Sequence, residues 1–179
     1  MTIFEYLSVA ASIVLALGVS RLASSIRHVF DPSRRDAVHA ALFVLLFLIH
    51  LLHWWRLWPL HDVQAWNFLQ FLIVMGGPIS LYIAAAALVS DEPAEVVSWR
   101  AHLAEAHRWF FSVLAVSIVF GVLQITLVLE AQLQLLLAVV VITPLLIGAV
   151  LPNRKVHIAV TAVVWVNVLL VIRDYFRAS

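Results

Sequence analysis

The stretch from Trp109 to Leu151 constrains the fold more than any other part of the chain. It is almost continuously apolar and contains a single charged residue, Glu130. As one straight helix it would extend about 65 Å at a rise of ~1.5 Å per residue, which is roughly twice the ~30 Å hydrocarbon core of a bilayer. The chain must therefore reverse direction, and the polar cluster Glu130–Gln134 predicts a tight hairpin there.

The rest of the chain has the same character. Of its 179 residues, 64% are hydrophobic and 12% are charged, whereas soluble domains are about half apolar and a quarter charged. The polar side chains are too few to cover the surface of a water-soluble protein of this size. We therefore expect the chain to lie in lipid. The net charge of +1 provides no basic surface for nucleic acid. The absence of cysteine excludes disulfides, Cys-ligated metals and thiol catalysis.

Apolar runs of about 20 residues predict an all-α polytopic membrane protein, a single transmembrane domain over residues 1–179. The runs lack the period-2 alternation of a membrane β-barrel. A segment with an acidic start and an early proline, residues 93–108, is expected to form an interfacial helix that leads into the fourth span. The bundle of six transmembrane helices is expected at residues 4–23, 38–58, 66–89, 109–129, 133–151 and 156–172.

The basic residues predict the orientation of the bundle. Eight of the eleven lie in the connections after the first, third and fifth spans: Arg21, Arg27, Arg34, Arg35, Arg100, Arg108, Arg154 and Lys155. By the positive-inside rule this face is cytoplasmic, so both termini are expected on the non-cytoplasmic side.

The segment HLLHWWRLWPLH, residues 50–61, carries the most unusual group of side chains at the end of an apolar run. We interpret its tryptophans as part of an aromatic belt at the headgroups, with Arg56 extending toward water. His50 and His53 lie one helical turn apart, a spacing compatible with two metal ligands. A third ligand would have to come from elsewhere, and Glu5 is a candidate at the same membrane face.

The third span contains the sequence Gly76-Gly77-Pro78 near its middle. Proline removes a backbone donor, so a kink or a short unwound stretch is expected. Such breaks form binding sites in transporters. Asn67 and Gln70 lie on the same side of this span. In the fourth span, Gln124 is expected to bond to Asn167 across helices.

These features favour a transport or channel-like protein in which Glu5, His50 and His53 form a titratable cluster near the outer face. One alternative is a metal- or haem-binding redox module using His50 and His53. Another is a non-catalytic subunit or assembly factor of a larger membrane complex. The expected partners are the lipid bilayer and either further copies of the chain or a larger complex. The remaining transport-path candidates are Arg56, Asn67, Gln70, Gly77, Pro78 and Gln124.

Sequence patterns of known enzymes are missing. The chain contains no Gly-x-Ser-x-Gly, His-Glu-x-x-His, Walker or dinucleotide-binding glycine pattern, which disfavours an enzyme. The sequence assigns no cofactor.

The pieces IFEYLSVAASIVLALGVSRL, WNFLQFLIVMGGPISLYIAAAAL and HRWFFSVL occur in this order along the chain. Together they resemble an uncharacterised family of small bacterial multi-pass integral membrane proteins. The resemblance implies a bacterial inner (plasma) membrane. It implies no activity, cofactor or partner, so no functional residue is carried over from it.

Overall fold

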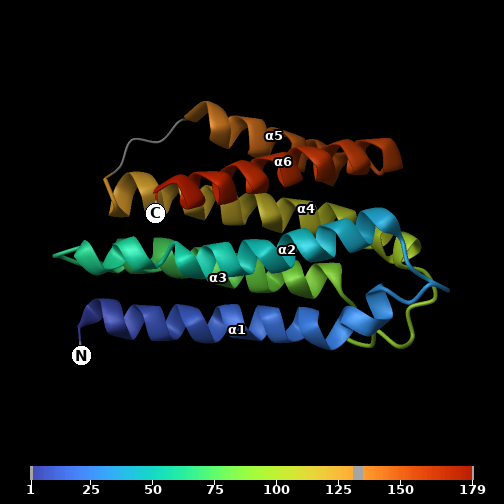
Figure 1. Cartoon of the computed structure of the whole chain (residues 1–179), viewed down its shortest axis with the longest axis horizontal. Helices are drawn as coiled ribbons and strands as arrows, with labels where there is room; N and C mark the ends of the chain where they lie inside the picture. The colour runs from blue at the N-terminus through green and yellow to red at the C-terminus, as the bar shows by residue number, and fades with distance from the viewer. Residues whose placement is uncertain (1, 131–134, 179) are drawn as a thin grey trace.

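The computed structural model describes residues 2–130 and 135–178, with side chains over 2–130 and 138–177. Within these ranges the chain is all-helical and has no strands, which confirms the predicted fold class. The elements are α1 Ile3–Val29, α2 Ala37–Trp55, the 3₁₀ turn η1 Trp58–Asp62, α3 Phe68–Leu88, α4 Trp99–Leu123, the π-helical turn η2 Gln124–Val128, α5 Leu135–Val150 and α6 Arg154–Ala178 (Figure 1).

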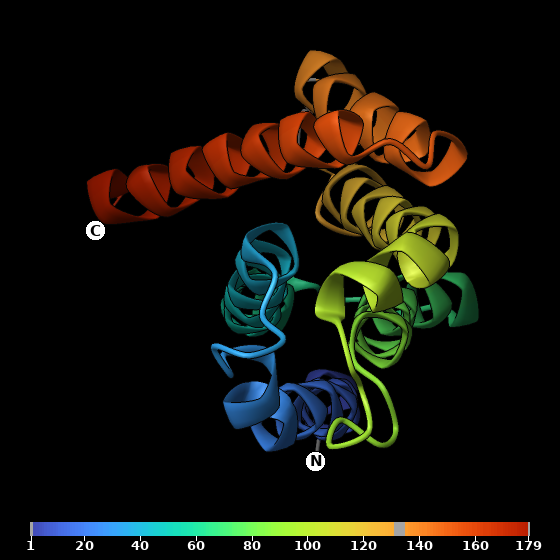
Figure 2. The same ribbon diagram turned by 90° about the vertical axis from the view of Figure 1, so that its right-hand side faces the viewer.

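Helices α3 and α4 form the centre of the bundle. Helix α3 packs on α1 and on α4, and α4 in turn carries α5. Helix α2 contacts α1, α3 and α4, and α6 reaches both α5 and α2. Viewed end-on, α6 runs obliquely across the others toward the C-terminus (Figure 2). The face of α2 that turns inward is therefore shared with three neighbouring helices.

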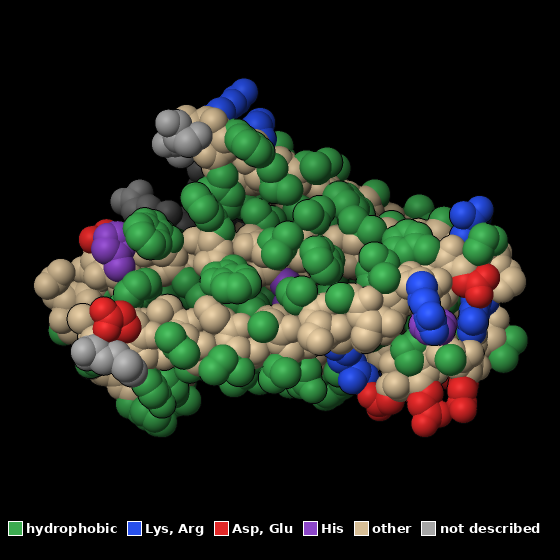
Figure 3. Space-filling model, turned by 60° about the horizontal axis from the view of Figure 1, so that its bottom comes forward, with side chains coloured by type: hydrophobic (Ala, Val, Ile, Leu, Met, Phe, Trp, Pro, Cys, Tyr) green, Lys and Arg blue, Asp and Glu red, His purple; other side chains and the backbone are tan. Residues whose placement is uncertain are grey.

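Length and composition indicate a membrane protein. Among the described residues, five helical segments are long and apolar enough to span a bilayer. Helix α5 has 16 residues, which at ~1.5 Å each is shorter than the ~30 Å hydrocarbon core. Large apolar side chains lie exposed along the outer faces, whereas charged side chains gather toward the two ends of the molecule (Figure 3). Such a surface is suited to lipid around the middle of the bundle and to water at its ends.

The helix predicted over residues 93–108 forms only from Trp99 onward, where it leads into the fourth span as expected. Helix α4 begins only at Trp99, where the Ser98 side chain caps it, and then continues without a break through Leu123. The acidic residue expected to start the helix, Asp91, instead forms an ion pair with Arg21. Arg34 donates to the carbonyl groups of residues 94 and 96 at 2.7 and 3.0 Å. Contacts with distant arginines therefore hold this segment as a loop.

Trp99 of α4 lies where four helices meet at this end of the bundle. Its side chain is fully buried, and its indole N–H donates to the backbone carbonyl of His28 at 2.7 Å. The ring of His39 stacks on it with a centroid separation of 4.6 Å. The His39 Nε2–H donates to the Leu88 carbonyl at 2.8 Å, at the end of α3. The ends of α1 and α3 and the starts of α2 and α4 thus meet around one indole.

The predicted hairpin at Glu130–Gln134 is described only at its first residue. The π-helical turn ends at Leu129, and Glu130 has a φ of 49°. A left-handed residue directly after the last turn is a common way for a helix to end. The other residues of the predicted turn, 131–134, lie outside the described part of the chain.

Asp36 fastens α6 to α2. Its carboxylate accepts from the backbone N–H groups of Val38 and His39 and so caps α2. The same side chain binds Arg154, at the first turn of α6, at 2.7 Å. Burial by itself raises the pKa of Asp36, but the two N–H groups and the Arg154 guanidinium outweigh this effect, so the pKa lies below its ordinary value.

This pair predicts an acid-sensitive contribution to stability. Because the folded-state pKa of Asp36 is lowered, its stabilisation is complete above the unfolded-state pKa of about 3.9 and is lost as the pH falls through the folded value. Asp36→Asn keeps a capping side chain but loses the charge, so we expect it to lower the free energy of unfolding by about 1–2 kcal/mol at pH 7. Thermal unfolding in detergent at pH 7 and pH 3 measures this effect.

The matched control is Asp174→Asn, which removes one partner of the exposed pair between Arg173 and Asp174. We expect less than about 0.5 kcal/mol from it, since exposed ion pairs contribute little. A difference between Asp36→Asn and wild type that stayed the same at pH 3 would argue against the charge as the cause.

The arrangement of the helices also predicts a shared compartment for the two termini. Both lie at the same end of the bundle, opposite the connection between α3 and α4 (Figure 1). Accessibility reporters fused to the N- and C-termini are therefore expected to give the same non-cytoplasmic signal. A reporter inserted at Glu92 is expected to give the cytoplasmic one. Opposite signals from the two termini would contradict this topology.

Candidate functional site

A row of three polar side chains runs along the buried face of α2 near its C-terminal end. His50, His53 and Arg56 are spaced by three residues and so lie on the same side of the helix. His50 and His53 are 1% and 6% exposed, and Arg56 is partly buried. We call these three residues the polar row. Each of them rests against a glycine on a different neighbouring helix.

His50 packs against Gly18 of α1. A methyl group on Gly18 would lie 2.9 Å from the ring Cδ2 atom and closer still to Nε2, so only glycine leaves room for the imidazole. The Nδ1–H donates to the Leu46 carbonyl one turn earlier, at 2.8 Å. In the neutral ring Nε2 is then a bare acceptor, and it has no hydrogen-bond partner.

His53 packs against Gly77 of α3 in the same manner. A methyl group on Gly77 would lie 2.9 Å from Nε2 and closer to Cε1. The His53 Nε2 atom is buried and has no hydrogen-bond partner. Two imidazoles one turn apart thus present ring nitrogens to the interior of the bundle without a protein group that binds them.

Arg56 completes the polar row at the end of α2. Its guanidinium nitrogens lie 3.3 and 3.4 Å from the place where a Cβ of Gly121 would be. One of them donates to the Gly121 carbonyl of α4 at 3.4 Å. The expectation that Arg56 extends to the outside water is therefore wrong. Gly121 allows this side chain to turn inward toward α4.

The predicted cluster of Glu5 with the two histidines does not form. The Glu5 side chain is exposed and accepts from the backbone N–H of Thr2 in a capping box at the start of α1. Gly18, against which His50 packs, lies about 20 Å further along the same helix at ~1.5 Å per residue. Glu5 stabilises the start of α1, whereas His50 packs near the middle of that helix.

Asn67 and Gln70 also form a capping box, here at the start of α3, with bonds of 2.9 and 3.0 Å. Helix α3 then runs without interruption from Phe68 to Leu88, so the predicted unwound stretch at Gly77 and Pro78 does not occur. The Ser80 hydroxyl donates to the carbonyls of residues 76 and 77. The glycine pair serves side-chain packing, since His53 fills the space at Gly77.

Gln124 is 2% exposed and donates to the Arg56 carbonyl at 3.4 Å, which ties η2 to the end of α2. The predicted partner for Gln124 was Asn167, so that pairing is wrong. Gln124 nevertheless lies beside the polar row, at Arg56.

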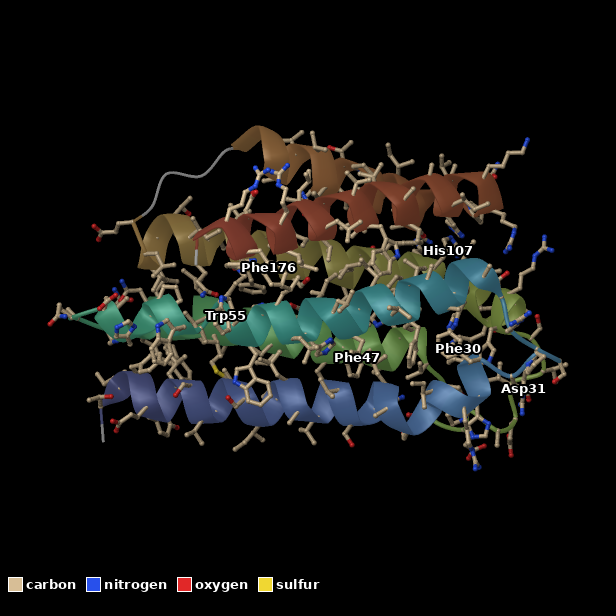
Figure 4. The ribbon with its side chains drawn as sticks, in the orientation of Figure 1. Phe30, Asp31, Phe47, Trp55, His107 and Phe176 are labelled. Carbon is tan, nitrogen blue, oxygen red and sulfur yellow. The ribbon has the colours of Figure 1, made fainter. Side chains whose placement is uncertain are left out.

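Two further histidine contacts lie in the first part of α4, within the helix predicted over residues 93–108. His107 is 9% exposed and packs against His157 of α6, with ring centroids 5.1 Å apart; Figure 4 marks His107 on α4. His102 contacts His39 and Trp99 edge to face. Both contacts belong to helix packing at the end of the bundle that contains Trp99, which we call the basic end. From the sequence, only the spacing of His107 from Trp99 and Leu103 on one face of α4 could have suggested that His107 is buried.

Among the described residues, His50 and His53 do not belong to a larger group of potential metal ligands. Within the described ranges, no group of three or more His, Asp or Glu side chains could hold a metal ion. His50 and His53 are the two potential ligands predicted from the sequence, and no third one joins them there.

Comparison of the chain with profiles of known protein families, with curated proteins and with solved structures finds no match in any of the three. The function is therefore inferred from the polar row and its surroundings.

The contact between His50 and Gly18 predicts the effect of adding one methyl group. Alanine favours a helix over glycine by up to ~1 kcal/mol, but the collision with a buried ring that is held by its own hydrogen bond is expected to cost about 1–3 kcal/mol. We expect Gly18→Ala to lower the thermal unfolding midpoint in detergent. Ala16→Val, on the exposed face of the same helix, is the control and should have little effect.

The double variant Gly18→Ala/His50→Ala separates this collision from a general effect on α1. Without the ring the added methyl has space, so the double variant should be more stable than the sum of the single effects. Simple additivity would show that the two residues do not compete for the same space.

Proposed function

We propose that this is a small transport or channel-like protein of a bacterial inner membrane, in which His50 and His53 carry protons through the bundle. The observation that carries the proposal is the pair of buried imidazoles with ring nitrogens that no protein group binds. Titratable groups within a membrane are costly and mark ion or proton pathways in many transporters and pumps.

The position of the pair supports this role. The candidate span containing α2 runs from Ala37 to Asp62, and His50 lies near its middle. An imidazole gains and loses a proton near neutral pH, which makes histidine suitable for proton transfer. The two rings are offset by one helical turn, about 4.5 Å along the axis at ~1.5 Å per residue. A proton or a water molecule could pass between them over a short distance.

The polar row also provides a direction. It begins near the middle of the bundle at His50 and ends at Arg56, beside Gln124, at the end that contains both termini. Gly77 and Pro78 remain part of the proposed path because His53 packs there. Glu5, Asn67 and Gln70 have no role in it, since their side chains cap helices.

Proton flux into liposomes tests the proposal. The purified chain is reconstituted with a pH-sensitive dye inside, and a potassium gradient with valinomycin sets the membrane potential. We expect wild-type flux above that of empty liposomes. His50→Gln and His53→Gln keep a polar side chain of similar size but cannot relay a proton as an imidazole does, so each should reduce flux by about tenfold or more.

Two variants are matched controls. His61→Gln removes an exposed histidine at the same end of α2, and Glu5→Gln removes the carboxylate of the α1 capping box. Both should conduct as wild type does. Wild-type flux equal to that of empty liposomes would contradict transport and favour the subunit alternative. Stoichiometric purification with a larger complex in mild detergent would then identify that role.

A further inference from the structure

We propose that a small pocket at the end of the polar row binds a phosphate group through Arg56. The pocket lies between the end of α2, η2 and α6 and has a volume of about 190 Å³. Its wall includes the polar side chains of Arg56, Gln124 and Tyr175 and the indole rings of Trp55 and Trp58. We call it the Arg56 pocket. Phosphate binding there goes beyond proton transfer and does not depend on it.

The charge of Arg56 is the first argument. In the described part of the chain, its guanidinium makes a single hydrogen bond to protein, a long one of 3.4 Å to the Gly121 carbonyl. The ion pairs found there use other basic side chains: Arg21, Arg34, His61, Arg154 and Arg173. A guanidinium withdrawn from water without an anion is costly, so an anionic partner would relieve that cost.

The chemistry of the wall is the second argument. A guanidinium presents several N–H donors in a planar fork that matches the oxygens of phosphate and carboxylate groups. The Gln124 amide and the Tyr175 hydroxyl add donors from two other elements. Donors from three directions suit a tetrahedral oxyanion better than a planar one. The volume is below that of sites for drug-sized ligands, but it accommodates one phosphate group.

The backbone beside the pocket is the third argument. Helix α4 changes to a π-helical turn at Gln124. Such turns are rare and frequently mark functional sites, because they displace one residue from the regular helical position. Here the turn begins at the residue whose amide lines the pocket and donates to the Arg56 carbonyl.

The location indicates where the phosphate comes from. Trp55 and Trp58 are 66% and 68% exposed at the pocket, which places it at the level where tryptophans meet lipid headgroups. Figure 4 shows Trp55 on α2 and Phe176 on α6 at this end of the bundle, and both residues line an apolar groove beside the pocket. A lipid could place its phosphate in the pocket and a chain in the groove, whereas a free phosphate would use the pocket alone.

Binding is measured on the purified full-length chain in dodecyl maltoside, which contains no phosphate. Isothermal titration with inorganic phosphate forms one arm, and titration with phosphatidylglycerol in maltoside micelles forms the other. We expect saturable binding in at least one arm. Saturation by inorganic phosphate that competes with the lipid indicates a free anion site, and saturation by the lipid alone indicates a headgroup site.

Arg56→Gln is expected to weaken binding about tenfold or more, since a charge-assisted bond of roughly 1.4 kcal/mol corresponds to a factor of ten. Arg173→Gln is the matched control, because it removes an exposed arginine from α6 at the same end and should leave the affinity unchanged. Absence of saturable binding in both arms, or an equal loss in the two variants, would overturn the proposal.

Tyr175→Phe removes one pocket hydroxyl and no bulk, so it tests the pocket even if Arg56→Gln does not fold. We expect it to weaken binding about fivefold, the effect of losing one neutral donor. An affinity equal to that of wild type would exclude Tyr175 from the site and count against three-sided recognition. Because each arm measures binding directly, a failure of proton flux in liposomes leaves this test unaffected.

Discussion

The packing of α2 side chains into spaces left by glycines holds the polar interior of this protein together. Gly18, Gly77 and Gly121 belong to three different helices, and each accommodates one member of the polar row. Without these spaces the imidazoles and the guanidinium could not be enclosed between α1, α3 and α4. In lipid, close packing must supply what the hydrophobic effect supplies in water, so small residues at helix contacts have an unusually large role.

The two ends of the bundle differ in how their polar groups are bound. At the basic end, side chains donate hydrogen bonds to free backbone carbonyls: Arg34 to residues 94 and 96, and Trp99 to the end of α1. At the other end, the Arg56 guanidinium donates one long bond, to the Gly121 carbonyl, and none of the ion pairs found among the described residues includes it. At the basic end, the loops and helix ends are therefore held by side chains of the protein itself. The other end provides a charged group beside an open pocket, which is where binding is proposed.

The sequence predicted the helices well because a run of about 20 apolar residues in a bilayer can satisfy its backbone hydrogen bonds by itself only as a helix. It also pointed to His50, His53 and Arg56. It failed where a side chain had two possible partners. Asp91 had the pattern of a helix cap but binds Arg21, 70 residues away, and Glu5 was assigned to the histidines but caps its own helix. Local patterns do not reveal which distant group competes for an acidic side chain.

The sequence by itself determined that the chain is helical and apolar, and that α2 carries imidazole and guanidinium groups on one face. Periodicity and composition are properties of single segments, so they can be read along the chain. Only the tertiary structure decided that this face turns inward, that each polar side chain meets a glycine of another helix, and that Gln124 and Tyr175 join Arg56 around one pocket. Those outcomes depend on the relative rotation and height of neighbouring helices, which packing sets and no single segment contains.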